Sequence, residues 1–288
     1  MGIKKKVLII LVFANVFFWS MIFYFSQAEG LEVCFLDIGM GDAIFIKTEL
    51  GHQILIDGGP NDRVIKKLEE RMPFWDRTID LIVLTHPDKD HMFGLIEVLK
   101  RYKVENILWT GIETDSLLAK EWEEAIVREG AKIWIAEQGL NINISKSQYI
   151  NLLYPFESLE GRAVSNKNNT SIVMVLNADK YRILFTGDAE KKIEQWLVEK
   201  EYDLKAQILK VSHHGSKTGS SIDFIEAVQP DVAIICASEN NQYGFPHEET
   251  LANLSESGIT ILQTSNYKKD ICLIQKKNEP FLFLSPTQ

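Results

Sequence analysis

Short runs of hydrophobic residues, separated by glycines and polar turns, follow one another through the first part of the chain. Leu31–Ile38, Ala43–Thr48 and Gln53–Ile56 are apolar and bounded by turn residues, which is typical of antiparallel strands. Residues 62–72 instead place apolar side chains at helical spacing, and Pro73 follows them as a stop signal. The pattern therefore predicts three strands and then a helix.

Further along the chain, strand-like and helix-like patterns alternate. The expected strands are Ile79–Leu84, Asn106–Trp109, Lys132–Ala136, Ser171–Leu176, Tyr181–Phe185, Ala206–Val211, Val232–Cys236, Thr260–Gln263, Ile271–Gln275 and Phe281–Leu284, and the expected helices are Leu95–Tyr102, Ser116–Glu129, Lys191–Lys200, Ile222–Val228 and Glu248–Ser257. Such alternation predicts a layered α/β fold with partly parallel sheets. No repeat of fixed period and no linker interrupts it, so we expect one domain over residues 29–288.

Residues 1–28 have a different character. Three lysines, Lys4 to Lys6, precede an uncharged apolar stretch from Val7 to Ser26, which is about the 20 residues that a membrane-spanning helix needs. Positive charge on the short side predicts that this end stays in the cytoplasm and the rest is exported. Ser26-Gln27-Ala28 also resembles a cleavage site, so a removed signal peptide competes with a membrane anchor. Both interpretations place the domain outside the cytoplasm.

Charge and cysteine usage narrow the function classes. The net charge is −9, so the basic surface that marks most nucleic-acid binders is missing, although bound metals would supply local positive charge. The three cysteines, Cys34, Cys236 and Cys272, lie in apolar runs without a C-x-x-C motif. We interpret them as small buried residues, with one disulfide as the alternative.

Four potential metal ligands follow the apolar run Ile79–Leu84 directly. They are His86, Asp88, Asp90 and His91. Imidazoles and carboxylates this close together repel one another or remain hydrated unless a cation gathers them. The alternative is a polar loop before a helix, with Asp90 as its N-cap.

Three other segments bring similar side chains to the ends of predicted strands. They contain Asp188, the pair His213 and His214, and His247. Imidazole and carboxylate ligands at strand ends can converge on one sheet edge, where a carboxylate such as Asp188 can bridge two divalent cations. The pattern predicts metal-assisted hydrolysis by a shared, metal-bridging hydroxide.

In this combination the chain resembles the metallo-β-lactamase superfamily, and most closely the metallo-β-lactamase-like domain of ComEC-type competence DNA-uptake proteins. The matching segments are residues 36–43, 55–59, 86–91, 168–173, 185–188, 211–217 and 243–247. The resemblance implies an αββα sandwich of two mixed sheets with a dimetal site at one edge.

The resemblance also implies roles for individual residues. It assigns His86 and Asp88 to a first metal, Asp90 and His91 to a second, Asp188 to the bridge, His247 to the last ligand position, and His214 rather than His213 to the first site, with Asp42 and Asp57 as supporting groups. Zn²⁺ is the expected ion, and the oxygen-rich ligand set makes Mn²⁺ an alternative.

Polar residues that the resemblance places beside the metals suit a phosphate substrate. They are Asn168, Asn169, Ser171, Ser216 and Lys217. We expect phosphodiester hydrolysis in which Asp90 orients the hydroxide and His213 assists the leaving oxygen, with single-stranded DNA as a candidate substrate. Hydrolysis of another envelope ester, of a phosphocholine type or a lactam, and a non-catalytic surface module are the alternatives. No protein partner is deducible.

Overall fold

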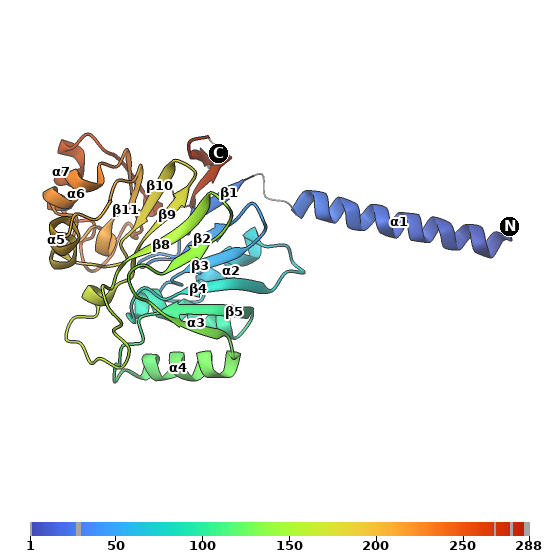
Figure 1. Cartoon of the computed structure of the whole chain (residues 1–288), viewed down its shortest axis with the longest axis horizontal. Coiled ribbons are helices and arrows are strands. Elements are labelled where there is room, and N and C mark those ends of the chain that lie inside the picture. The colour runs from blue at the N-terminus through green and yellow to red at the C-terminus, as the bar shows by residue number, and fades with distance from the viewer. Residues whose placement is uncertain (1, 27–29, 268, 277–278, 285–288) are drawn as a thin grey trace.

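Two mixed β-sheets lie face to face, with helices on the outer surface of each (Figure 1). The computed structural model describes residues 2–26, 30–267, 269–276 and 279–284. This arrangement confirms the αββα sandwich expected from the sequence.

The first sheet has eight strands, and its second half is parallel. Its order is β15 (Leu282–Leu284), β14 (Ile271–Gln275), β1 (Leu31–Phe35), β2 (Ile44–Lys47), β3 (Gln53–Ile56), β4 (Thr78–Val83), β5 (Lys103–Trp109) and β6 (Lys132–Ile135). Pairing is parallel from β3 to β6 and antiparallel elsewhere.

The second sheet has seven strands. Its order is β13 (Thr260–Gln263), β12 (Val232–Ile235), β11 (Ile208–Lys210), β10 (Tyr181–Phe185), β9 (Val173–Ala178), β8 (Gln148–Tyr154) and β7 (Asn141–Asn143). Pairing is parallel from β10 to β13 and antiparallel from β7 to β10. Each sheet therefore has a parallel part whose carboxyl ends can present side chains at a common edge.

The helices bury apolar faces against the sheets. The first sheet is covered by α2 (Arg63–Arg71), α3 (Lys89–Leu99) and α4 (Leu117–Glu129), and the second by α5 (Lys191–Glu199), α6 (Ile222–Val228) and α7 (Glu248–Glu256). The short elements are α8 (Thr264–Tyr267), η1 (Asn168–Thr170) and η2 (Ser212–Gly215). Between the sheets, Phe35 and Phe185 pack with ring centroids 6.1 Å apart, so one apolar core joins the two layers.

Helix α3 differs from its prediction in a way that affects the site. It begins at Lys89 rather than Leu95, so Asp90 and His91 lie in its first turn. His91 and Leu95 are four residues apart and both buried, so they lie on the same buried face of the helix. The sequence pattern missed the first turn because His91 is polar and does not continue the apolar periodicity. The N-cap position belongs to Asp88, whose side chain makes no capping bond, so the N-cap interpretation of Asp90 is wrong.

Strands β7 and β8 were not predicted. Asn141 and Asn143 of β7 are exposed at the edge of the sheet, and a polar edge strand has no hydrophobic alternation to reveal it. The other predicted elements are present, and their ends differ by only a few residues.

Two of the three cysteines differ from the expectation that all are unpaired buried residues, and the alternative of one disulfide is correct. Cys34 and Cys272 form a disulfide, and Cys236 is free and buried. The two bonded residues face each other directly in the antiparallel pair of β1 and β14. Because they are 238 residues apart in the sequence, only the strand order brings them together.

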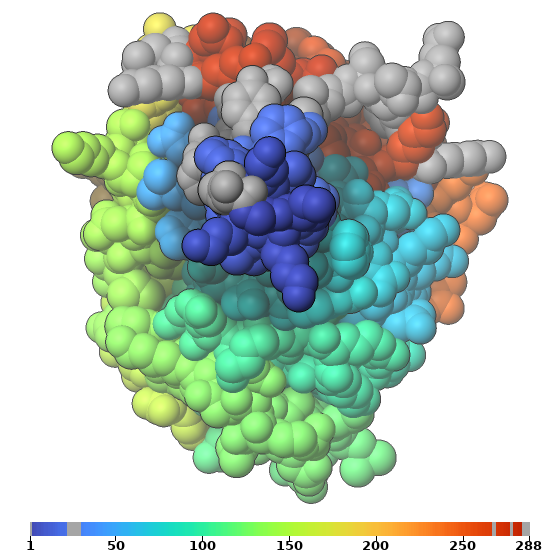
Figure 2. All heavy atoms as spheres, turned by 90° about the vertical axis from the view of Figure 1, so that its right-hand side faces the viewer, coloured from blue at the N-terminus to red at the C-terminus, as the bar shows by residue number. Residues whose placement is uncertain are grey.

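Helix α1 (Ile3–Ser26) extends away from the sandwich (Figure 1), and Figure 2 views it nearly end-on. Its bulky side chains, such as Phe13, Phe17 and Trp19, are exposed. In the described part of the chain, however, no helix is long and apolar enough to cross a membrane. The membrane-spanning anchor predicted for residues 1–28 is therefore not supported within the described residues.

Candidate metal centre

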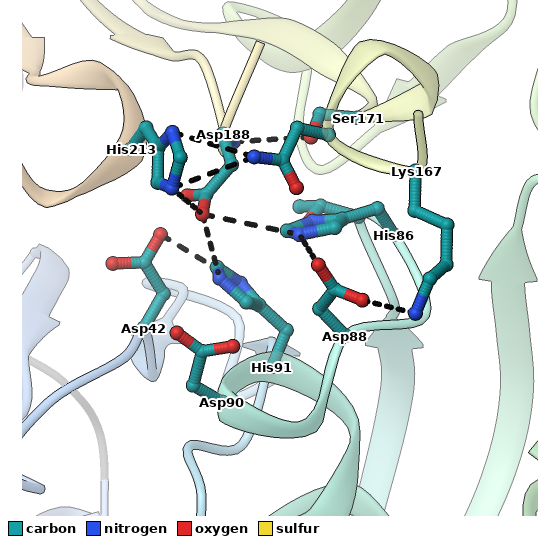
Figure 3. A network of polar contacts seen from close by, with 12 residues as sticks. Asp42, His86, Asp88, Asp90, His91, Lys167, Ser171, Asp188 and His213 are labelled. Carbon is teal, nitrogen blue, oxygen red and sulfur yellow. Dashed lines mark hydrogen bonds and ion pairs between the residues drawn. The ribbon is translucent and has the colours of Figure 1, made fainter. Parts of the chain in front are cut away.

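The predicted ligands other than His247 meet at one edge of the sandwich, where strands of both sheets end (Figure 3). His86 follows β4, and His91 lies in the helix that comes next. Asp188 follows β10, and His214 lies in the turn after β11. The carboxyl ends of parallel strands in two different sheets thus supply one cluster.

Asp90, His91, Asp188 and His214 form the most compact group. One donor atom from each lies within 4.8 Å of the others. Oδ2 of Asp188 is 3.3 Å from Nε2 of His91 and 3.5 Å from Nε2 of His214, and the same His214 atom is 3.3 Å from Oδ2 of Asp90.

The buried atoms of this group fit a divalent cation. Nε2 of His91, Nε2 of His214 and Oδ1 of Asp188 are buried without a hydrogen-bond partner, although buried polar atoms are nearly always satisfied. Nitrogen and carboxylate donors in such a set are those that Zn²⁺ and Mn²⁺ take in proteins.

A second, more open set contains His86, Asp88 and Asp188. Nε2 of His86 is 3.7 Å from Oδ2 of Asp88 and 3.9 Å from Oδ2 of Asp188, and it too has no hydrogen-bond partner. Burial, and then the neighbouring His91, lower the pKa of His86 to about 3, so the imidazole is neutral as a ligand must be. Lys167, which the sequence analysis did not identify, forms an ion pair with Asp88.

Asp57 fixes the orientation of His91. Its carboxylate lies 2.8 Å from Nδ1 of His91 and accepts hydrogen bonds from the backbone N–H and the hydroxyl of Thr85. The ring therefore presents Nε2 to the cluster, as outer carboxylates do for metal-binding histidines. The loop that contains Asp57 and Gly58 packs closely against α3. A Cβ on Gly94 would lie only 1.8 Å from the Gly58 carbonyl oxygen, so this contact requires glycine.

His213 and His214 lie in a strained turn. Their φ angles are +47° and +54°, a left-handed conformation that is uncommon for histidine and frequent at functional sites. Nδ1 of His214 donates to the Cys236 carbonyl oxygen at 2.9 Å, which directs Nε2 into the compact group. His213 lies at the rim, with Nε2 3.8 Å from Oδ2 of Asp188 and its ring near the Asn168 amide.

Charge in the cluster is balanced by the histidines and a lysine. Burial opposes a proton on His91, but Asp188 and Asp57 outweigh it and raise the pKa of His91 well above its usual value. Burial likewise opposes a proton on His214, yet Asp188 and Asp42 raise its pKa to about 9. The carboxylates thus attract positive charge, which favours a cation over protons at high pH.

Lys210 is the main residue that sequence reasoning missed. It is fully buried, forms an ion pair with Asp42, donates to the Gly187 carbonyl oxygen at 3.0 Å and lies 3.7 Å from Oδ1 of Asp188. A lysine within a strand-like run just before two histidines was the available signal.

Other predicted residues lie outside the cluster. Nδ1 of His247 accepts the Lys217 backbone N–H at 3.0 Å, and no described contact joins His247 to the compact group, so its role as a ligand stays a prediction. Ser171 is buried, and its hydroxyl accepts the Asp188 backbone N–H at 3.0 Å, which suits positioning rather than substrate contact. Asn169 is bonded to Glu190.

Two predicted substrate residues differ in exposure. Ser216 is buried, and its hydroxyl is 3.1 Å from that of Thr218. Lys217 is exposed beside the histidine turn. The phosphate contacts of Ser216, Lys217 and Asn168 stay predictions.

Comparisons with known proteins agree with this geometry. A model described as the metallo-beta-lactamase superfamily matches residues 36–239. The chain is 30% identical over 267 residues to ComE operon protein 3 of Bacillus subtilis (strain 168), covering 87% of this chain and 34% of that protein. It is 29% identical over 268 residues to Recombination protein 2 of Haemophilus influenzae, covering 87% of this chain and 30% of that protein.

The chain thus spans about a third of the length of these curated relatives. Among solved structures, it resembles the metallo-beta-lactamase fold protein YhfI from Bacillus subtilis with a TM-score of 0.54 and 10% identity, covering 81% of this chain and 96% of that one. That likeness concerns the fold.

Proposed function

Because the chain belongs to the metallo-beta-lactamase superfamily, we propose that it is a metal-dependent phosphodiesterase that cleaves DNA or a related phosphodiester outside the cytoplasm. The observation that carries the proposal is the convergence of Asp90, His91, Asp188 and His214, in which buried atoms of the last three residues have no hydrogen-bond partner. These four residues would hold one cation, and His86 and Asp88 would hold a second with Asp188 between them. Divalent cations there would lower the pKa of bound water and polarise a phosphate oxygen.

The protein groups around this centre suit a phosphodiester. Asp90 has a side chain that is 31% exposed, against 4% for Asp188, so Asp90 can accept a hydrogen bond from the attacking water. His213 and Asn168, whose amide nitrogen lies 3.3 Å from Nδ1 of His213 at the rim, can donate to phosphate oxygens. Lys217 adds positive charge on the exposed side.

Two observations support DNA and an extracytoplasmic location. The names of the curated relatives refer to recombination and to the ComE operon, which fits a role in DNA handling. The Cys34–Cys272 disulfide is typical of proteins in oxidising compartments.

The test is hydrolysis of bis(p-nitrophenyl) phosphate by the purified protein, with metal content measured by mass spectrometry. Asp188→Ala should abolish both turnover and bound metal, while circular dichroism and the unfolding transition report that the variant is folded. Full activity in folded Asp188→Ala would contradict the proposal.

A substrate panel separates the alternatives. Single- and double-stranded DNA, RNA, a phosphocholine ester and a lactam should be compared on the metal-loaded protein. Preference for the lactam or the phosphocholine ester would replace the phosphodiesterase proposal within the same superfamily. A folded protein that takes up no Zn²⁺ or Mn²⁺ would indicate a non-catalytic surface module.

A further inference from the structure

Three aromatic rings in contact lead from the candidate metal centre to the surface. They belong to His213, Phe245 and Tyr243, and we call them the aromatic row. The Phe245 ring contacts the His213 ring edge-on, with centroids 5.3 Å apart, and stacks on Tyr243 with centroids 5.5 Å apart and planes at 19°. Tyr243 is 54% exposed. The row begins 3.8 Å from Asp188 and ends in solvent.

The loop that carries this row is held in place. The Asn241 side chain accepts hydrogen bonds from the backbone N–H groups of Tyr243 and Phe245, and it donates to the carbonyl oxygens of Ser238 and Phe245. These four bonds fix the loop without help from a ligand. With the loop backbone held in this way, the stack on Phe245 orients the exposed ring of Tyr243.

The loop is also attached to the histidine turn. The His247 backbone N–H donates to the Gly215 carbonyl oxygen at 2.9 Å, and the Lys217 backbone N–H donates to Nδ1 of His247 at 3.0 Å. Contact is close enough that a Cβ on Gly215 would lie 2.5 Å from Cβ of Pro246. The aromatic row thus keeps a fixed distance from the candidate metal centre, and the exposed Lys217 lies on the same turn.

We propose that the aromatic row is a stacking subsite for an unpaired nucleobase, which selects single-stranded nucleic acid for cleavage at the metal centre. Exposed aromatic rings beside a positively charged side chain, here Lys217, bind single strands because every base has a face to stack, and one such contact is worth about 1–3 kcal/mol. A duplex hides those faces, and a phosphocholine ester or a lactam has no base to stack. This inference rests on the proposed phosphodiesterase function and names its substrate class.

The experiment compares two fluorescein-labelled oligomers of equal length. One is oligothymidylate, and the other has the same deoxyribose-phosphate backbone with every base removed. Fluorescence anisotropy in EDTA gives affinities without cleavage. The wild-type protein should prefer oligothymidylate, and Tyr243→Ala should weaken its binding by about five- to a hundred-fold without affecting the abasic oligomer. Tyr243→Phe keeps the ring and is the matched control, expected to bind as the wild type does.

Each outcome has one meaning. Equal wild-type affinity for the two oligomers, or an equal loss of both in Tyr243→Ala, would overturn the stacking subsite. Hydrolysis of bis(p-nitrophenyl) phosphate by the metal-loaded wild-type protein is measured in parallel. Turnover without any base preference rejects the subsite alone, whereas absence of turnover on every phosphodiester rejects the proposed function.

Discussion

The ammonium group of Lys210 lies beneath the candidate metal centre in a fully buried ion pair with Asp42. The same group is 3.7 Å from Oδ1 of Asp188, and Asp42 is 3.4 Å from Nδ1 of His214. Lys210 therefore places a fixed positive charge behind two of the proposed ligands. It keeps Asp42 ionised, since the attraction of Lys210 and of His214 exceeds the cost of burial and lowers the pKa of Asp42 to about 2.

Lys210→Met should destabilise the protein strongly. Removing one member of a buried ion pair leaves an uncompensated charge and typically costs about 3–5 kcal/mol. Urea unfolding followed by circular dichroism measures the change. Lys191→Met is the matched control, because Lys191 pairs with Glu249 at the surface, where such pairs contribute only about 0–1 kcal/mol. Similar effects of the two substitutions would show that the buried pair has no special role.

Lys167 should weaken metal binding by the more open ligand set of His86, Asp88 and Asp188. Its ammonium group pairs with Asp88 and competes with a cation for the same carboxylate. Lys167→Met should therefore tighten binding of the second metal equivalent, by up to about five-fold since the pair is partly exposed, whereas Asp88→Asn should weaken it.

Isothermal titration with Mn²⁺ measures this effect. The first equivalent, which we assign to the compact group of four, should keep its affinity in Lys167→Met. Equal binding of both equivalents by the variant and the wild-type protein would contradict competition by Lys167.

The sequence was informative about the site wherever ligands follow one another closely. His86, Asp88, Asp90 and His91 lie within six residues, so one strand end suffices to gather them. The layered α/β class was equally accessible from the alternation of strand-like and helix-like segments, whereas the αββα sandwich was expected from the family resemblance.

What the sequence could not predict depends on contacts between distant segments. Lys210 looks like an ordinary strand residue until β10 and β11 place it beside Gly187 and Asp42. The choice between His213 and His214 depends on which ring meets the Cys236 carbonyl oxygen. Nδ1 of His247 accepts the Lys217 backbone N–H, a contact between separate segments that the sequence does not reveal, and its role as a ligand stays a prediction.

The Cys34–Cys272 disulfide should stabilise the domain. It closes a loop of 238 residues, and in the chain-entropy description such a link restricts the unfolded state, with typical effects of about 2–5 kcal/mol. The double variant Cys34→Ala/Cys272→Ala should lose this amount in urea unfolding without reductant. With dithiothreitol present, the wild-type protein should fall toward the variant, and the variant should not respond. An unchanged wild-type transition after full reduction would contradict the effect.

Glu194 should make stability fall as the pH rises. It is buried in α5 and accepts backbone hydrogen bonds from Ser220 and Ser221. Burial raises its pKa from 4.5 to about 7, although these bonds oppose the shift. Between these two values the unfolded chain has lost the proton and the folded chain keeps it. The unfolding free energy therefore decreases from about pH 4.5 to pH 7 and the contribution then levels off, on the order of 3 kcal/mol in total.

Glu194→Gln removes this titration. Because its side chain is neutral, the free energy of unfolding of the variant should differ from that of the wild-type protein by a constant amount below pH 4.5. From pH 4.5 to pH 7 the wild-type protein loses stability and the variant does not, so the variant becomes more stable relative to it. Urea unfolding at closely spaced pH values measures the difference, and Glu199→Gln, an exposed change on the same helix, is the control expected to follow the wild-type curve. A wild-type and Glu194→Gln difference that stays constant from pH 4 to pH 8 would contradict the raised pKa, because it would mean that the two backbone donors offset burial and that Glu194 titrates alike in the folded and unfolded protein.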